Sequence, residues 1–115
     1  MSQHAPKLEA IRDLINSGRV PEAHARCQAL VQASPRDAEA ARLFSEICLY
    51  TDDQPRALFF AQRAAELEPD HPGHVFHLAW VHRVQRKPEL ALKLLDKAIP
   101  RMPAAQRLLE VKAAV

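Results

Sequence analysis

Histidines are the residues of this chain with the clearest potential for chemistry, and four of the six crowd into one stretch, at His71, His74, His77 and His82. Neutral imidazole is a common ligand of zinc and related metals. On a helix, His74 and His77 would lie on adjacent turns and could share an ion. A zinc site needs more ligands than that pair supplies, and no cysteine or acidic residue nearby completes the set. We therefore expect no metal and no other cofactor, and histidines that lie on the surface or fill the core.

Sequence signatures of catalysis are missing. The two glycines of the chain cannot build a phosphate-binding loop, and neither the H-E-x-x-H nor the G-x-S-x-G pattern occurs. Asp52 and Asp53 are paired carboxylates, but they fall in a polar turn, whereas acid–base catalysis needs a cleft that sets two pKa values apart. The sequence therefore predicts that this chain by itself is not an enzyme.

One group of aromatic and basic residues suits binding rather than catalysis. Phe76, Trp80 and Arg83 follow one another at helical spacing, so they would share one side of a helix. Aromatic rings beside a guanidinium are the usual composition of a hot spot in a protein interface. The alternative is that both rings pack against Tyr50 and Leu108, because aromatic residues at helical spacing are often core residues.

The elements that carry these residues are predicted to be helices. The chain has 115 residues, 48% of them apolar and 26% charged, with a net charge of +2, which is the balance of a globular protein. Twenty alanines and fourteen leucines stand against seven valines and one threonine, so helix formers outnumber strand formers. This composition predicts an all-α fold.

The same composition limits the partners and the location. The basic residues are scattered without a run of like charge, so nothing favours nucleic acid as a partner. No segment is long and apolar enough to span a membrane, and the N-terminus lacks the pattern of a secretory signal. Cys27 and Cys48 lie among helix formers, outside any C-x-x-C pair, which is typical of buried thiols in a reducing compartment. We expect a cytoplasmic protein that binds neither nucleic acid nor membrane.

The spacing of the prolines indicates an internal repeat. Two columns of residues recur with a period of 34, namely Pro35, Pro69 and Pro103, and Ala23, Ala57 and Ala91. A further set of prolines nearly shares the period and precedes stretches rich in alanine and leucine, as prolines in the first turn of a helix do: Pro21, Pro55 and Pro88. Each unit therefore holds two helices. We predict helices at Lys7–Ser17, Pro21–Ala33, Ala38–Thr51, Pro55–Leu67, Pro72–Arg86 and Pro88–Ile99, and a seventh from Ala104 onward.

Each predicted helix has one apolar face. The inward residues of the first helices are predicted to be Ala10, Ile11 and Leu14, then Phe44, Ser45 and Cys48, then Leu78, Ala79 and His82. Those of the second helices are predicted to be Ala23, Cys27 and Leu30, then Ala57, Ala61 and Ala64, then Ala91, Leu95 and Ala98. Small alanines at the crossing points let helix axes approach closely.

This unit of two helices, with its alanine column and its closing proline, resembles the tetratricopeptide repeat, most strongly in residues 53–70. The resemblance implies a right-handed α-solenoid of antiparallel helix pairs with about seven helices, in a single domain over residues 1–115. The repeats would span residues 4–37, 38–71 and 72–105, with a capping helix at 104–115. The chain departs from the family pattern at Lys7, Ala41 and Val75, where the family has tryptophan.

The resemblance further implies that the first helix of every unit lines a concave groove that holds a peptide or a partner helix. The candidate groove residues are Arg12, Asn16, Arg42, Glu46, Tyr50, Phe76, Trp80 and Arg83. The three arginines either pair with carboxylates of a ligand or form a solvated face in which Arg42 pairs with Glu46. Related domains clamp the acidic tails of chaperones with basic and amide residues, and this chain has others at the matching positions, so such a ligand is disfavoured.

These observations predict a non-catalytic protein interaction module or scaffold, either a monomer or a weak homo-oligomer. The first alternative is a segment of a larger protein, since similar arrays precede sulfotransferase and glycosyltransferase domains. In its favour, the amphipathic stretch from Ala104 to Val115 ends without a polar tail, as a capping helix cut short would. The second alternative is self-assembly through uncapped ends of the solenoid.

Overall fold

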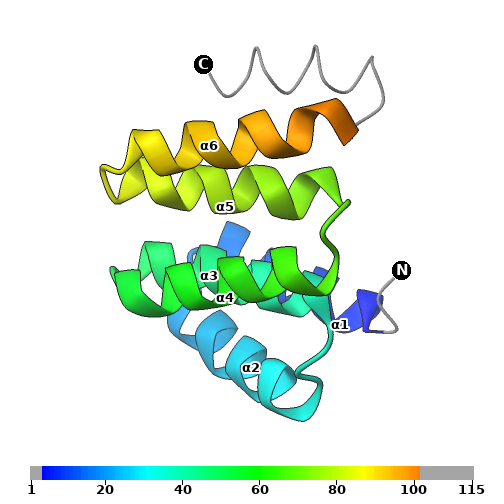
Figure 1. Ribbon diagram of the computed structural model, residues 1–115. Helices are drawn as coiled ribbons and strands as arrows, with labels where there is room; N and C mark the ends of the chain where they lie inside the picture. The colour runs from blue at the N-terminus through cyan, green and yellow to red at the C-terminus, as the bar shows by residue number, and fades with distance from the viewer. Residues whose placement is uncertain (1–3, 102–115) are drawn as a thin grey trace.

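The computed structural model describes residues 4–101, which form six α-helices, one short 3-10 helix and no strand. The helices are α1 (Ala5–Asn16), α2 (Val20–Ala33), α3 (Ala38–Tyr50), α4 (Gln54–Leu67), α5 (Pro72–Val84) and α6 (Pro88–Ala98), followed by the 3-10 helix η1 (Ile99–Arg101). Figure 1 shows that α3 and α4 form the middle layer of a stack, with α1 and α2 on one side and α5 and α6 on the other.

The helices begin and end where local signals in the sequence place them. All twelve predicted ends of the first six helices lie within two residues of the observed ones. Every helix except α3 has a proline in its first turn. The backbone N–H that proline lacks has no partner within the helix at this position, so its loss costs nothing. Instead, α3 has a capping side chain, because Asp37 accepts a hydrogen bond of 3.1 Å from the backbone N–H of Ala40.

The chain changes conformation at Pro100. Helix α6 ends at Ala98, and Pro100 lies in the 3-10 turn that follows, because a proline lacks the N–H that would continue the α-helix. The predicted helix from Ala104 onward lies outside the described residues. None of the helices in residues 4–101 is long and apolar enough to cross a bilayer.

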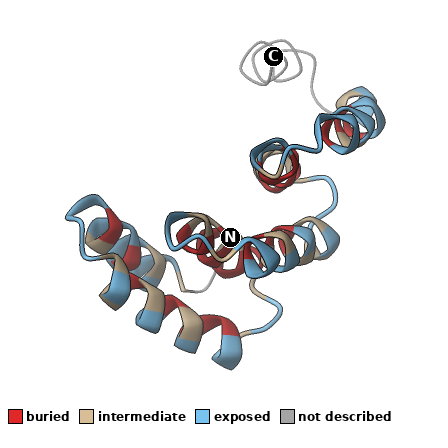
Figure 2. Ribbon diagram, turned by 90° about the vertical axis from the view of Figure 1, so that its left-hand side faces the viewer, coloured by how far each residue is buried: buried red, intermediate tan, exposed pale blue. Residues whose placement is uncertain are grey.

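Figure 2 shows that the buried stretches of the ribbons lie on the sides of the helices that face one another. All nine residues predicted to face inward from the second helices are buried, and so are the predicted inward residues of α3 and α5. In α1, Ile11 is buried and Leu14 half-buried, but the prediction for Ala10 is wrong, because this residue is exposed. Ala10 lies at the end of the described stack, where no further helix pair covers α1.

The turn inside each helix pair repeats one backbone conformation. Gly18, Asp52 and Arg86, spaced by 34 residues, have φ values of +79°, +57° and +62°. This left-handed region suits glycine and costs about 1–2 kcal/mol for a residue with a Cβ. The fold therefore enforces the same turn in all three units, although only the first has the residue that adopts it easily.

The first helices of the three pairs lie side by side, because α3 contacts both α1 and α5. Each also packs against the second helix of its own pair. As a result, side chains of α1, α3 and α5 are brought onto one common face of the molecule.

Candidate functional site

A groove of about 540 Å³ opens on the face formed by α1, α3 and α5. It is lined by Arg12 of α1, by Glu46, Leu49 and Tyr50 of α3, and by His77, Trp80 and Val84 of α5. This volume lies within the range of pockets that hold small ligands or single side chains. Four of the eight candidate residues chosen from the sequence, Arg12, Glu46, Tyr50 and Trp80, therefore meet in one place.

An ion pair crosses the floor of the groove between the first two units. The Nη1 atom of Arg12 lies 2.7 Å from Oε2 of Glu46, and the two side chains are 44% and 26% exposed. One of the two alternatives drawn from the sequence paired Glu46 with Arg42 on the same helix, and that pairing is wrong. Stacking places Arg12 of the neighbouring helix opposite Glu46, so the pair forms between units rather than along α3.

A buried hydroxyl connects three helices beneath the groove. Ser45 of α3 is fully buried and donates a hydrogen bond of 2.5 Å to the carbonyl oxygen of Ala57 in α4. Its oxygen lies 2.8 Å from Nε2 of His77 in α5. Because the single hydroxyl proton is already directed at a carbonyl, Ser45 accepts from His77, and Nε2 must carry the imidazole proton. The neutral ring then keeps Nδ1 as a hydrogen bond acceptor.

Burial also determines the charge of this imidazole. Desolvation lowers the pKa of His77 to about 4, and the nearby carboxylate of Glu46 opposes the shift only in part. His77 is therefore neutral at neutral pH. With Arg12 and Glu46 paired, the groove presents little net charge to a ligand.

Two exposed aromatic residues stand at the groove. Tyr50 is 66% exposed and Trp80 52% exposed, values that are unusual for such large apolar side chains. The guanidinium carbon of Arg83 lies 6.0 Å from the centre of the Trp80 ring, at the outer limit of a cation–π contact.

The remaining candidates do not line the groove. Phe76 is half-buried against Ala79, Ala91 and Leu95, in the core between α5 and α6. Residues four apart on a helix are offset by about 40°, and this offset is enough to turn Phe76 towards α6 while Trp80 faces the groove. Phe76 is thus a packing residue, but its neighbours in the described part of the chain lie on α5 and α6 and do not include Tyr50, and Leu108 lies outside the described residues.

Arg42, Asn16 and Arg83 also fall outside the groove lining. The guanidinium of Arg42 reaches the start of α5, so near Gly73 that a Cβ there would clash with it. Asn16 is exposed at the end of α1. The three arginines singled out from the sequence therefore do not form one cluster that could grip a carboxylate.

The 34-residue period identifies the groove better than residue type does. Arg12, Glu46 and Trp80 occupy one column of the repeat, and all three line the groove. Sequence reasoning missed His77 as a groove residue, because its partner Ser45 belongs to a different column and only the stacking of α3 on α5 brings the two together.

The histidines are grouped differently from the pairing of His74 with His77 that the sequence suggested. The side chains of His71 and His74 stack with ring centres 3.9 Å apart, and Nε2 of His74 lies 2.9 Å from Oε1 of Glu68. Ligand atoms of Glu68, His71 and His74 all lie within 4.8 Å of one another. The prediction that no acidic residue completes the histidine set is therefore wrong, because the loop after α4 returns Glu68 to the first turn of α5. His77 and the buried His82 stand apart from this group.

Comparison with known proteins finds its matches among solved structures. No family model matches the chain, and no curated protein does. The TPR protein YrrB, described as having an unusual peptide-binding site, superposes with a TM-score of 0.77 at 22% identity, over 98% of this chain and 58% of YrrB. This chain has a tetratricopeptide-like fold.

Two further structures share the tetratricopeptide-like fold with this chain. The Yersinia enterocolitica type III secretion translocator chaperone SycD matches with a TM-score of 0.77 at 16% identity, over 99% of this chain and 93% of SycD. An O-GlcNAc transferase of Thermobaculum terrenum matches with a TM-score of 0.72 at 20% identity, over 90% of this chain. The chain spans only 21% of the length of that enzyme, so the likeness covers a small part of it.

Proposed function

We propose that this protein is a non-catalytic interaction module that binds a segment of a partner protein in the groove between α1, α3 and α5. The observation that carries the proposal is the pair of exposed aromatic residues, Tyr50 and Trp80, in a groove to which all three helices contribute side chains. The likeness to a peptide-binding TPR protein and to a chaperone supports the same class of function.

The energetics of Trp80 favour a binding role. Covering the exposed half of an indole ring removes a large apolar area from water at about 25 cal/mol per Å². The neighbouring residues leave 52% of Trp80 exposed, and the guanidinium carbon of Arg83 lies 6.0 Å from the centre of its ring. A partner side chain placed there would gain that energy, which is why tryptophan is enriched among residues that dominate binding.

The groove defines the chemistry of the segment that fits it. The Arg12–Glu46 pair cancels its own charge, and His77 is neutral, so an acidic tail gains little here. Leu49, Trp80 and Val84 offer contact to an apolar side chain, and the polar groups between them can orient a backbone. We propose a short peptide with an apolar or aromatic anchor and no strong net charge.

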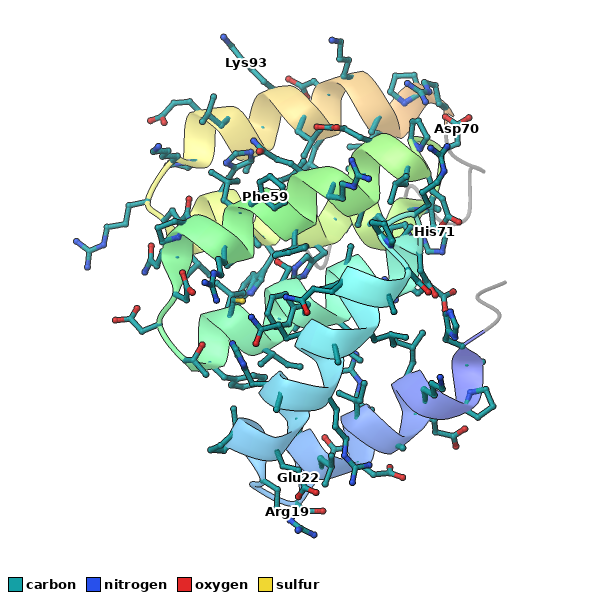
Figure 3. All side chains as sticks on the ribbon, turned by 90° about the horizontal axis from the view of Figure 1, so that it is seen from below. Arg19, Glu22, Phe59, Asp70, His71 and Lys93 are labelled. Carbon is teal, nitrogen blue, oxygen red and sulfur yellow. The ribbon has the colours of Figure 1, made fainter. Side chains whose placement is uncertain are left out.

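A selection experiment tests this function with a matched control. Peptides are selected from a random library displayed on phage against the full chain, and their affinities are measured by fluorescence anisotropy. Trp80→Ala is expected to weaken binding roughly tenfold or more. Phe59→Ala is the control, because Phe59, which Figure 3 labels on α4, is 59% exposed and is not among the residues that line the groove.

The outcomes separate clearly. Loss of affinity in Trp80→Ala with an unchanged Phe59→Ala supports the groove. Selected peptides that bind Trp80→Ala as tightly as the unaltered chain, or failure to select any binder, would overturn the proposal. Circular dichroism of both variants shows whether the helices are intact, since an exposed side chain is not needed for the core.

A further inference from the structure

We propose that Glu68, His71 and His74 form a binding site for a divalent transition metal ion of the zinc type, at the connection between α4 and α5. The three side chains follow the pattern E-x-x-H-x-x-H over seven consecutive residues. Imidazole and carboxylate are ordinary ligands of zinc. The site lies apart from the groove, whose lining includes none of these residues.

Local structure explains why the three side chains meet. Glu68 directly follows α4, and His71 is the N-cap of α5, where its Nδ1 accepts a hydrogen bond of 3.4 Å from the backbone N–H of His74. This bond directs the other nitrogen of His71, Nε2, away from the helix end. His74 stands in the first turn of α5 and is fully buried, so packing holds its ring in place. Figure 3 labels His71 at this end of the molecule, beside Asp70.

The distances are close to those that an ion needs. The ligand atoms lie within 4.8 Å of one another, and Nε2 of His74 is 2.9 Å from Oε1 of Glu68. In a tetrahedral zinc site with bonds of about 2.0–2.1 Å, ligand atoms stand roughly 3.4 Å apart. The stacked rings of His71 and His74 are inclined by only 18°, so His71 must rotate for both lone pairs to converge. Glu68 is exposed and can adjust around the fixed His74, whereas rotation of the half-buried His71 would exchange its long cap bond of 3.4 Å for the bond to the ion.

Three protein ligands leave one position of a tetrahedral ion for water or for a group of a partner. The bound ion would tie the end of α4 to the start of α5 and so fix how the third helix pair sits on the second. A positively charged side chain lies beside the proposed site, because the guanidinium of Arg42 and the ring of His71 both approach Gly73, and the charge of Arg42 also acts on His74. Removal of that charge is therefore expected to strengthen metal binding.

Calorimetric titration of the full, untagged chain with ZnCl₂ tests the site, with MgCl₂ as the comparison ion. Two variants remove a ligand while keeping the local hydrogen bonds. His71→Asn preserves a side chain that can cap α5, and Glu68→Gln preserves an acceptor for His74. Glu66→Gln is the control, because Glu66 is an exposed carboxylate two residues earlier on α4.

We expect one zinc ion per chain, no magnesium binding, and a melting temperature that rises with zinc concentration. His71→Asn and Glu68→Gln are each expected to weaken zinc binding by roughly tenfold or more, with an unchanged melting temperature in the absence of metal, whereas Glu66→Gln binds as the unaltered chain does. Arg42→Met is expected to bind zinc more tightly. The proposal is overturned if zinc does not bind, or if it binds equally well to His71→Asn and Glu68→Gln.

Discussion

Replacement of Ser45 by alanine is expected to destabilise the fold strongly for so small a change. Ser45 is fully buried, donates to the carbonyl oxygen of Ala57 and accepts from Nε2 of His77. The alanine variant loses the first hydrogen bond, at about 1 kcal/mol, and leaves the imidazole N–H without its acceptor, at about 1–3 kcal/mol. Alanine has a higher helix propensity than serine, which stabilises the folded state of the variant by about 0.5 kcal/mol. The expected net loss is about 1.5–3.5 kcal/mol.

Urea unfolding followed by circular dichroism measures this loss. Ser17→Ala is the matched control, because Ser17 also donates to a helix carbonyl, the oxygen of Asp13 at 2.7 Å, but is exposed. Its expected cost is below about 0.5 kcal/mol. A double variant, Ser45→Ala with His77→Leu, should cost less than the sum of the two single variants, because the orphaned N–H is then gone. If Ser45→Ala is no less stable than Ser17→Ala, the hydroxyl does not connect the three helices.

Two further predictions concern pH and the turns. Burial lowers the pKa of His77 to about 4, from about 6.5 in an unfolded chain. Between about pH 6.5 and pH 4, His77 is therefore protonated in the unfolded state but neutral in the folded state. Stability contributed by neutral His77 is present above about pH 6.5 and falls by about 2–3 kcal/mol on acidification towards pH 4. His77→Gln should flatten this fall in urea titrations, and an equally steep fall in the variant would contradict the assignment. Arg86→Gly should stabilise the chain by about 0.5–1 kcal/mol, because Arg86 has a φ of +62°, and a lower melting temperature would refute that reasoning.

Much of the fold follows from the sequence because its signals are local. Prolines in the first turns and polar turn residues lie within a few positions of the ends they set, so the predicted ends agree closely with the observed ones. The inward faces are also periodic and could be predicted from one helix at a time. Ala10 is the exception, since its exposure depends on what covers the end of the stack.

The site was harder to predict because it depends on contacts between helices. The Arg12–Glu46 pair and the bond from His77 to Ser45 join residues 34 and 32 positions apart, and neither follows from spacing along one helix. The meeting of Glu68 with His71 and His74 depends on the course of a short loop. Two residues chosen for their place on a first helix, Arg42 and Phe76, make other contacts: Arg42 with the start of α5, and Phe76 with the core between α5 and α6.

The most direct test of the proposed groove uses the fluorescence of Trp80, which is the only tryptophan of the chain. Because its ring is 52% exposed at the groove, a segment bound there must take it out of water. Titration with a peptide selected on the full chain should shift the emission of Trp80 to shorter wavelength, saturably and with the midpoint found by anisotropy. Phe59→Ala should give the same curve. Peptides that bind by anisotropy while the emission of Trp80 stays unchanged would show that the binding surface lies elsewhere.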